Sequence, residues 1–395
     1  MSERPILLDL TRLSARHLEG LHPTGVDRVV LAYLRHYRSR IRALVRHGGR
    51  WLRLPKKASD QLIAALLGES STSKRDIRWA VAHAHLFRED CHPKAWFFNL
   101  SHSGLEDPRY ARILQRQGLR PVYFVHDLIP LTHPEYARPG EDVRHAQRLD
   151  TIAMSGEAVI FNSRATQESW QTHWRNHGRP CHLPELVAPL GCETLPAPRA
   201  ERPLSDPYFV VLGTIEARKN HLLLLQIWRS WIESAGADVP LPKLVLIGRR
   251  GWECEQVVDL LERSLLLQGQ VLELGRCSDL DLATWLAHAQ ALLFPSFVEG
   301  FGLPLVEALS MGTPVIASDL AAFREAAGDI PEYLHPLDGM AWWDALRDYA
   351  TNGPRRQAQL RRLSTFQPGQ WAEHFALVDE FLDNLRADTQ RDSPS

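Results

Sequence analysis

Short apolar runs alternate with longer helical patterns along the chain, and this alternation limits the fold more than any other feature of the sequence. Strands that alternate with helices pair in parallel, because each crossover helix returns the chain to the same end of the sheet. We therefore expect an α/β protein with doubly wound sheets. The predicted strands are 6–10, 95–99, 121–125 and 158–162 in the first half, and 208–212, 243–247, 271–274, 291–294 and 314–317 in the second.

Helical spacing of apolar residues predicts a second set of elements between these strands. A proline-rich stretch without periodicity, residues 195–207, separates the two halves and is typical of a linker. Because 395 residues are too many for one ordinary core, we expect two domains. The predicted helices are 25–37, 60–67, 109–117, 143–154 and 164–173, then 222–234, 253–263, 279–289 and 305–309, with more from 340 onward.

The composition is that of a soluble globular protein, with 24% charged and 44% hydrophobic residues. No window approaches the roughly 18 apolar residues of a membrane span. The first residues, MSERPILLDL, lack the apolar region and cleavage site of a signal peptide. Five cysteines without C-x-x-C spacing predict a reduced, cytoplasmic protein without disulfides or structural zinc.

One segment, residues 28–57, is rich in arginine and lysine and has no acidic residue. Such a segment attracts polyanions or an anionic membrane surface, which predicts peripheral contact with the inner membrane face from Arg35 to Lys57. The alternative is a solvated helix face followed by a basic loop. Nucleic acid is not an expected partner, because the segment matches no known nucleic-acid-binding module.

Two glutamates eight positions apart, Glu299 and Glu307, flank a Gly-Phe-Gly turn. Pro304 fits the first turn of a helix that begins there. A helix N-terminus favours a phosphate group, and the backbone N–H groups placed at this one are those of Phe301, Gly302 and Leu303. Two carboxylates beside a phosphate site predict a polyhydroxy ligand that is held at both ends of a diphosphate.

Two cations, Arg218 and Lys219, come soon after the predicted strand 208–212 and its terminal Gly213. Open parallel sheets bind ligands at the carboxyl ends of their strands, so the pair is placed to neutralise a departing diphosphate. The alternative is a solvent-facing turn that caps a helix. With two cations and no D-x-D motif that would hold a metal ion, we expect neither a metal ion nor another cofactor.

His126 and Asp127 end the predicted strand 121–125 at the carboxyl edge of the first sheet. The histidine can bond a sugar or a phosphate oxygen, and the acid can orient it or a second substrate; a purely structural histidine is the alternative. Gly25, at the start of the first predicted helix, allows close approach of a ligand to the backbone. Gly248, in a G-x-x-G segment, is a weaker candidate for the phosphate side.

Three segments resemble glycosyltransferase family 4, a family of retaining enzymes: FVHDLIP at 124–130, VLGTIEARKNHLLLL at 211–225, and residues 294–319 with their E-x7-E spacing. The resemblance implies the GT-B fold, two Rossmann-like domains that face each other across a cleft. It assigns 1–200 to an acceptor-side domain and 206–369 to a domain that binds the nucleotide sugar. It also implies that the helix 370–386 packs back on the first domain, and the polar residues 387–395 are expected to be disordered.

In the family pattern, Glu307 accepts hydrogen bonds from the ribose and Glu299 lies beside the donor sugar. The residues to which the resemblance gives catalytic roles are His126, Asp127, Arg218, Lys219 and Glu299. The family has a richer glycine loop near Gly25, where this chain has one glycine. The other residues that the resemblance places around the nucleotide sugar are Gly25, Gly213, Gly248, Arg276, Cys277, Phe301, Gly302, Leu303 and Glu307.

The resemblance implies a retaining, metal-independent hexosyltransferase that extends a glycan or lipid-linked acceptor in the synthesis of a surface polysaccharide such as lipopolysaccharide or capsule. Mannose from GDP-mannose is the first donor expected; rhamnose, glucose, galactose and N-acetylated hexoses stay open. A nicotinamide oxidoreductase is disfavoured, because no G-x-G-x-x-G follows strand 6–10. The remaining alternative is a catalytically degenerate GT-B subunit that binds or scaffolds, although an inactive copy need not keep both cations and both glutamates.

Overall fold

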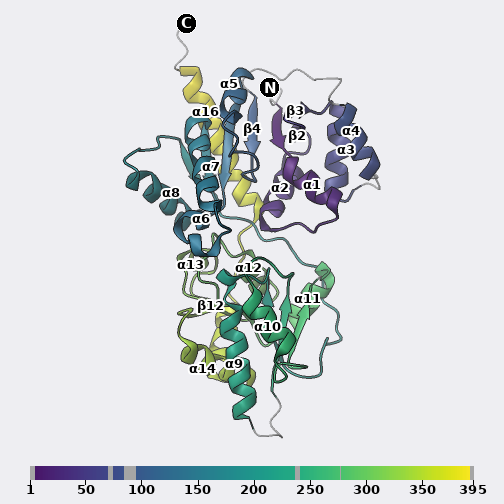
Figure 1. Ribbon diagram of the computed structural model, residues 1–395, viewed down its shortest axis with the longest axis vertical. Coiled ribbons are helices and arrows are strands. Elements are labelled where there is room, and N and C mark those ends of the chain that lie inside the picture. The colour runs from purple at the N-terminus through teal and green to yellow at the C-terminus, as the bar shows by residue number, and fades with distance from the viewer. Residues whose placement is uncertain (1–4, 70–73, 84–94, 236–240, 276, 392–395) are drawn as a thin grey trace. The chain divides into compact units, whose positions relative to one another are not determined.

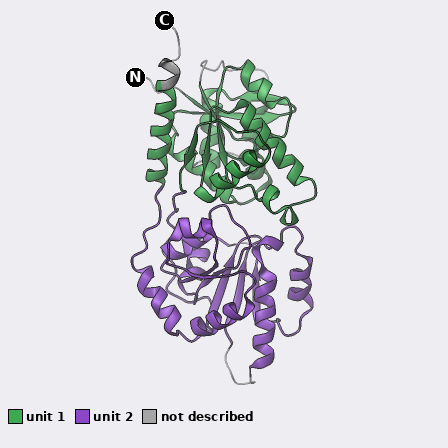
Figure 2. Ribbon diagram, turned by 90° about the vertical axis from the view of Figure 1, so that its left-hand side faces the viewer, with its two compact units in different colours: residues 1–189, 371–395 green, residues 190–370 purple. Residues whose placement is uncertain are grey.

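The computed structural model describes residues 5–69, 74–83, 95–235, 241–275 and 277–391 (Figure 1). The chain forms two compact units, coloured separately in Figure 2. Unit 1 is Met1–Pro189 with Trp371–Ser395, and unit 2 is Leu190–Gln370. The predicted linker, 195–207, therefore lies within unit 2. Arg199 holds this stretch to a helix of unit 2, because its backbone N–H donates to Thr284 Oγ1 over 3.1 Å.

Unit 1 contains a seven-stranded sheet in the order β3-β2-β1-β4-β5-β6-β7. All neighbouring strands are parallel except β2 and β3, which form an antiparallel pair. The chain moves outward from β1 in both directions, which is the doubly wound arrangement. The strands are β1 Ile6–Asp9, β2 Ile41–His47, β3 Arg50–Arg53, β4 Trp96–Asn99, β5 Arg120–Val125, β6 Ala158–Phe161 and β7 Glu185–Val187.

Helices connect and cover the strands of unit 1 (Figure 1). Thr24 and Asp27 form a capping box at the start of α2, and the Ser163 side chain accepts from the Thr166 N–H at the start of α8. The helices are α1 Thr11–Glu19, α2 Gly25–His36, α3 Lys56–Leu66, α4 Lys74–His83, α5 Tyr110–Arg116, α6 Ile129–Thr132, the 3₁₀ turn η1 Pro134–Tyr136, α7 Glu141–Ser155, α8 Arg164–Asn176 and α16 Trp371–Arg391.

The last helix, α16, lies against α2 of unit 1. The imidazole Nε2 of His374 is 3.0 Å from the hydroxyl of Tyr33, and the hydroxyl of Tyr37 donates to Asp379 over 2.7 Å. The expectation of a disordered tail over 387–395 is wrong for 387–391, because α16 continues to Arg391; residues 392–395 lie outside the described part of the chain. The segment RADTQR contains the good helix formers alanine, glutamine and arginine, which extend the helix.

Unit 2 contains a six-stranded parallel sheet in the order β10-β9-β8-β11-β12-β13, again wound outward from its first strand. The strands are β8 Tyr208–Leu212, β9 Lys243–Ile247, β10 Val271–Leu274, β11 Leu292–Phe294, β12 Val315–Ser318 and β13 Glu332–Leu334. The helices are η2 Ala217–Lys219, α9 His221–Ser234, α10 Glu255–Arg263, α11 Asp279–Ala287, α12 Leu303–Ser310, α13 Ala321–Ala327, α14 Gly339–Ala350 and α15 Pro354–Leu363. The predicted fold class, α/β with doubly wound parallel sheets, is confirmed in both units.

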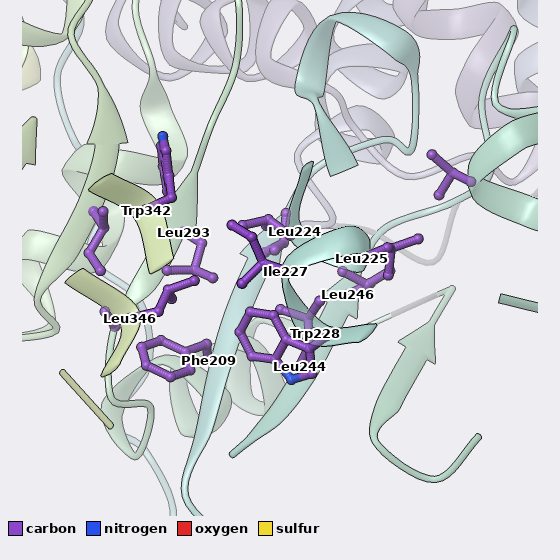
Figure 3. Close-up of a cluster of buried hydrophobic side chains, with 14 of the residues drawn as sticks. Phe209, Leu224, Leu225, Ile227, Trp228, Leu244, Leu246, Leu293, Trp342 and Leu346 are labelled. Carbon is purple, nitrogen blue, oxygen red and sulfur yellow. The ribbon is translucent and has the colours of Figure 1, made fainter. Parts of the chain in front are cut away.

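One face of the unit 2 sheet is covered by α9 and α14, whose apolar side chains form a continuous core (Figure 3). Trp228 of α9 and Trp342 of α14 are almost fully buried in this core, and they pack with Phe209 from β8. The indole N–H of Trp228 donates to the Pro242 carbonyl over 2.9 Å, so its one polar group is satisfied. This core fixes the strands whose carboxyl ends carry the predicted site residues.

The basic segment 28–57 differs from the alternative of a helix face followed by a basic loop, since its second part is a β-hairpin. In β2 the buried Ile41, Ala43 and Val45 alternate with Arg42 and Arg46. This two-residue period is the signature of a strand, and the hairpin pairs β2 with β3. The strands β7 and β13 and the helices α1 and α4 were also not predicted, because these strands have only three residues each and these helices are mainly polar.

In the described part of the chain, we find no helix that combines the length and the apolar character needed to cross a bilayer.

Two glycines at the ends of adjacent strands give a test of this packing. A methyl group on Gly248, after β9, would lie 1.9 Å from the backbone oxygen of Gly213, after β8, whereas one on Gly275, after β10, meets nothing within 4 Å. We expect Gly248→Ala to cost about 1–3 kcal/mol of unfolding free energy through backbone displacement, and Gly275→Ala almost nothing. Calorimetry of the two variants measures the difference; equal melting temperatures would contradict the close contact.

Candidate functional site

The carboxyl ends of β8 and β9 lie in direct backbone contact. Gly213 has a φ of 139°, a value that residues other than glycine rarely adopt. At Gly248 there is no room for a Cβ, because the Gly213 carbonyl lies there. The ideal Cβ position of Gly213 is also 3.5 Å from the Cε atom of Lys219. These two predicted residues thus have a geometric reason to be glycine: Gly213 has a positive φ, and its carbonyl lies where a Cβ of residue 248 would be.

The turn after β8 is held by loops that follow other strands. The backbone N–H of Phe297, after β11, donates to the Arg218 carbonyl over 2.8 Å. Asn220 closes the turn with a left-handed backbone, φ 55°, and its side-chain amide donates to the Pro336 carbonyl over 2.9 Å. The turn that carries the two cations is therefore fixed at the carboxyl edge of the sheet.

Glu299 accepts hydrogen bonds from both predicted cations. Its Oε1 atom is 2.7 Å from Arg218 Nη1 and forms a short ion pair with Lys219 Nζ. Ser296 Oγ donates to the same oxygen over 2.9 Å, and Arg218 Nη2 also pairs with Glu216 at 2.7 Å. Arg218, Lys219 and Glu299, with Ser296 and Glu216, form what we call the ion cluster. The structure brings together three of the residues that the sequence predicted.

Burial and charge oppose each other in the ion cluster. Burial by itself raises the pKa of Glu299, but the positive charges of Arg218 and Lys219 outweigh it and lower the pKa to about 2. Burial lowers the pKa of Lys219, and the attraction of Glu299 opposes that change. Glu299 is consequently ionised at neutral pH and compensates the charge of its neighbours.

The helix α12 starts beside the loop that contains Glu299. Gly302, which precedes α12, has a φ of 103°, and a Cβ there would lie 2.7 Å from the ring of Phe323. Pro304 lies in the first turn, as the sequence predicted, and the first N–H groups of any helix have no acceptor within it. Phe301 and Glu307 are buried, and Glu307 is only 2% exposed. No pattern in the sequence indicates that this glutamate is covered.

In unit 1, His126 and Asp127 follow β5 directly. The Nε2 atom of His126 is 2.7 Å from the Leu100 carbonyl. The backbone carbonyl of His126 accepts from the side-chain amide of Asn162 over 2.9 Å. Burial lowers the pKa of His126, so the imidazole favours its neutral form. Asp127 Oδ1 accepts from the Ile129 N–H over 3.0 Å and thereby begins α6.

Gly25 is the first residue of α2, next to a group of charges that sequence analysis did not identify. Asp27 is fully buried and forms ion pairs with Arg12 Nε at 3.2 Å and with Arg16 Nε at 2.8 Å. Arg12 and Asp27 both influence the charge state of His126, which places them near it. The signal that was available is an arginine just after β1 combined with an acid in the first turn of α2.

Two predicted residues of the nucleotide side give little geometric information. Arg276 lies outside the described residues. Cys277 is half-buried before α11, and burial together with Asp281 and Asp279 raises the pKa of its thiol to about 11. No group of three or more histidine, cysteine, aspartate or glutamate side chains is arranged to hold a metal ion among the residues that the structure covers.

Comparison with known proteins agrees with this picture. Residues 197–333 match the family model described as "Glycosyl transferases group 1". The O-antigen chain mannosyltransferase B of Escherichia coli is 36% identical over 226 residues, covering 55% of this chain and 58% of that protein. The serotype-specific mannosyltransferase WbdA of Escherichia coli is 28% identical over 237 residues, covering 54% and 28%. The chain thus spans less than two thirds of the length of these relatives.

Solved structures with low sequence identity share the fold. Sucrose-phosphate synthase of Thermosynechococcus elongatus has a TM-score of 0.64 at 17% identity and covers 98% of this chain and 100% of that one. HepE of Anabaena, solved with UDP and glucose, has a TM-score of 0.61 at 18% identity and covers 97% and 100%. The chain has the GT-B fold of these glycosyltransferases, and the likeness at this identity extends to the fold alone.

The pKa of Glu299 makes part of the stability depend on pH. A carboxyl whose pKa falls from 4.5 in the unfolded chain to about 2 in the folded protein stabilises the fold above pH 4.5, and this contribution is lost as the pH falls toward 2. We expect Glu299→Gln to lower the melting temperature at pH 7. The difference in melting temperature between the variant and wild type should shrink as the pH falls from 4.5 toward 2. Calorimetry at several pH values measures it, with the exposed Glu255→Gln as control. A difference that is constant with pH would contradict the assignment.

Proposed function

We propose that this chain is a retaining, metal-independent glycosyltransferase that moves a hexose from a nucleotide diphosphate sugar to a growing glycan or lipid-linked acceptor. The observation that carries the proposal is the ion cluster, which lies at the carboxyl edge of the unit 2 sheet and inside the segment matched by the family model. The O-antigen relatives support a place in the synthesis of a surface polysaccharide. In this proposal unit 2 binds the donor and unit 1 the acceptor.

The chemistry of the leaving group suits the two cations of the ion cluster. When the bond from the anomeric carbon to the diphosphate breaks, negative charge grows on the phosphate oxygens, and Arg218 and Lys219 stabilise it. Glu299 holds both cations in position before the donor arrives, so little reorganisation is needed. The acceptor hydroxyl passes its proton to a leaving phosphate oxygen, and this step requires no separate protein base.

Other predicted residues take binding roles in the proposal. The start of α12, at Gly302 and Leu303, contributes backbone N–H groups to a phosphate. Glu307 bonds the ribose, which requires a change that uncovers its carboxylate, since the side chain is buried. His126 offers Nδ1 to a sugar hydroxyl, because the Leu100 carbonyl occupies Nε2.

GDP-mannose is the first donor that we propose, because the two Escherichia coli relatives described above are mannosyltransferases by name. UDP-glucose is the second, since the structurally similar HepE was solved with UDP and glucose. The rival proposal, a degenerate GT-B subunit that binds or scaffolds, predicts nucleotide-sugar binding without turnover. Slow hydrolysis of the donor in the absence of acceptor separates the two.

The direct experiment offers GDP-mannose, UDP-glucose and dTDP and ADP sugars to the purified chain in EDTA and measures release of the nucleotide. We expect turnover with one of these donors and no effect of the chelator. Lys219→Met should lower that turnover about a hundredfold, because it removes a group aimed at developing charge. Chromatography of the released nucleotide measures kcat.

Lys243→Met serves as the matched control. Lys243 lies in the same unit as Lys219 but at the first residue of β9, where its Nζ donates to the Gly269 carbonyl over 2.7 Å. This variant should keep wild-type kcat. Wild-type turnover in Lys219→Met would remove the cation from the mechanism. Activity that EDTA abolishes and Mg²⁺ or Mn²⁺ restores would disprove metal independence.

A peripheral membrane contact through the basic segment is a separate part of the proposal. Arg46 does not contribute to it, because this side chain pairs with the buried Asp9 at 3.1 Å. The basic residues Arg50, Lys56 and Lys57 are exposed around β3 and the start of α3. An anionic surface would attract these three residues.

We expect the protein to sediment with anionic vesicles at low salt and the triple change of Arg50, Lys56 and Lys57 to Gln to weaken this binding, because each contributes about 1 kcal/mol. Screening should remove it as the Debye length shrinks from about 10 Å at 0.1 M salt to about 3 Å at 1 M. The control removes the same charge elsewhere in unit 1 by changing the exposed Arg112, Arg175 and Arg179 to Gln. Equal loss in both triple variants, or equal binding to neutral vesicles, would contradict a role of this segment.

A further inference from the structure

The loop that joins β4 to α5 holds a residue in an unusual backbone conformation. His102 has a φ of 57°, in the left-handed region that residues other than glycine seldom occupy. Such a conformation costs free energy, so it persists only where the surroundings impose it. Neither the sequence motifs nor the proposed mechanism uses this residue.

Contacts on both sides of His102 impose the conformation. The Asn99 side chain accepts from the Ser101 N–H over 3.2 Å and donates to the Ser103 carbonyl over 3.0 Å. Arg46 Nη2 donates to Ser103 Oγ over 2.6 Å. A Cβ on the next residue, Gly104, would lie 1.4 Å from the Arg46 guanidinium. The loop is thus fastened before and after the histidine.

This loop places the ring of His102 between two other buried histidines. Its ring centre is 5.6 Å from that of His126, after β5, and 5.5 Å from that of His145, on α7. The Nε2 atoms of His102 and His145 are both buried without a hydrogen-bond partner among the described residues. The three rings form a histidine cluster at the carboxyl edge of the unit 1 sheet.

The same loop determines which nitrogen of His126 carries the proton. A backbone carbonyl only accepts hydrogen bonds, so the 2.7 Å contact with Leu100 requires a proton on Nε2. Neutral His126 therefore has its lone pair on Nδ1, and this atom accepts a hydrogen bond from a hydroxyl. Protonation of Nδ1 would turn it into a donor and remove that ability.

The charges around the histidine cluster favour neutral rings. Burial lowers the pKa of all three histidines, and for His102 the neighbouring His145 and His126 lower it further. The charged groups that face the cluster are Asp127, Arg12 and Asp27 near His126, Arg148 near His102, and Asp127, Arg148 and Glu141 near His145. The ring of His102 packs against the ring of His126 and adds to its burial.

We propose that His102 is a positioning residue for His126: together with the Leu100 carbonyl, its ring holds the His126 imidazole with the proton on Nε2 and the Nδ1 lone pair available for a ligand hydroxyl. The orientation of His126 follows from contacts within unit 1. Only the use of Nδ1 by a sugar hydroxyl rests on the proposed function. The inference goes beyond that function, because it assigns the orientation of a site residue to a loop that no motif contains.

The test uses His102→Asn, because asparagine tolerates the left-handed backbone but lacks the ring. His102→Gly is the second variant, since it relaxes the backbone completely. Long-range ¹H–¹⁵N spectra of the full chain, labelled at its 18 histidines, report the tautomer and pKa of His126, assigned with His126→Gln. We expect the Nε2–H tautomer in wild type. In both variants we expect a mixture of tautomers and a higher His126 pKa, because water reaches the ring. The exposed His182→Asn is the control.

A wild-type tautomer and pKa of His126 in both folded variants would overturn the inference. This spectroscopic result needs no substrate, so it stands apart from the proposed function, which fails if wild-type protein turns over no nucleotide sugar. In an active enzyme, the acid side of the pH profile of kcat/KM, which reports the pKa of the free protein, should move to higher pH in His102→Asn. An unshifted profile would also contradict the positioning role.

Discussion

A buried carboxylate shared by two cations holds the unit 2 site together. Removal of a charge from water costs several kcal/mol, so Glu299 is stable in its place only because Arg218 and Lys219 lie against it. The cations come from the turn after β8 and the carboxylate from the loop after β11. These ion pairs therefore hold the loops after β8 and β11 together, whereas strand pairing alone does not determine the conformation of either loop.

Unit 1 uses the same principle at the carboxyl edge of its own sheet. Asp9, at the end of β1, is buried against Arg46 from β2, and Asp27 of α2 is buried between Arg12 and Arg16. Each pair joins a strand or a helix to a segment that is distant in the sequence. In both units, the edge where parallel sheets bind ligands is thus rigid before any ligand arrives, which is the condition for electrostatic stabilisation of a transition state.

The basic segment shows how sequence counting and structure diverge. In the sequence, Arg46 and Arg50 are equal members of a run without acids. In the structure, Arg46 is partly buried, pairs with the buried Asp9 and holds the loop around His102, whereas Arg50 is exposed. A strand sends alternate side chains to opposite faces, and only the packing of the sheet decides which face is covered.

The sequence by itself determined the α/β class, the bounds of β8, β9 and β10, and the position of the cations after β8. These features follow from short-range causes: apolar periodicity, glycine at strand ends and proline in a first helical turn. Only the tertiary structure decided that Lys219 bonds a glutamate 80 positions away, that Glu307 is covered, and that His102 lies against His126. These contacts depend on strand order and loop packing, which bring together residues that no local pattern relates.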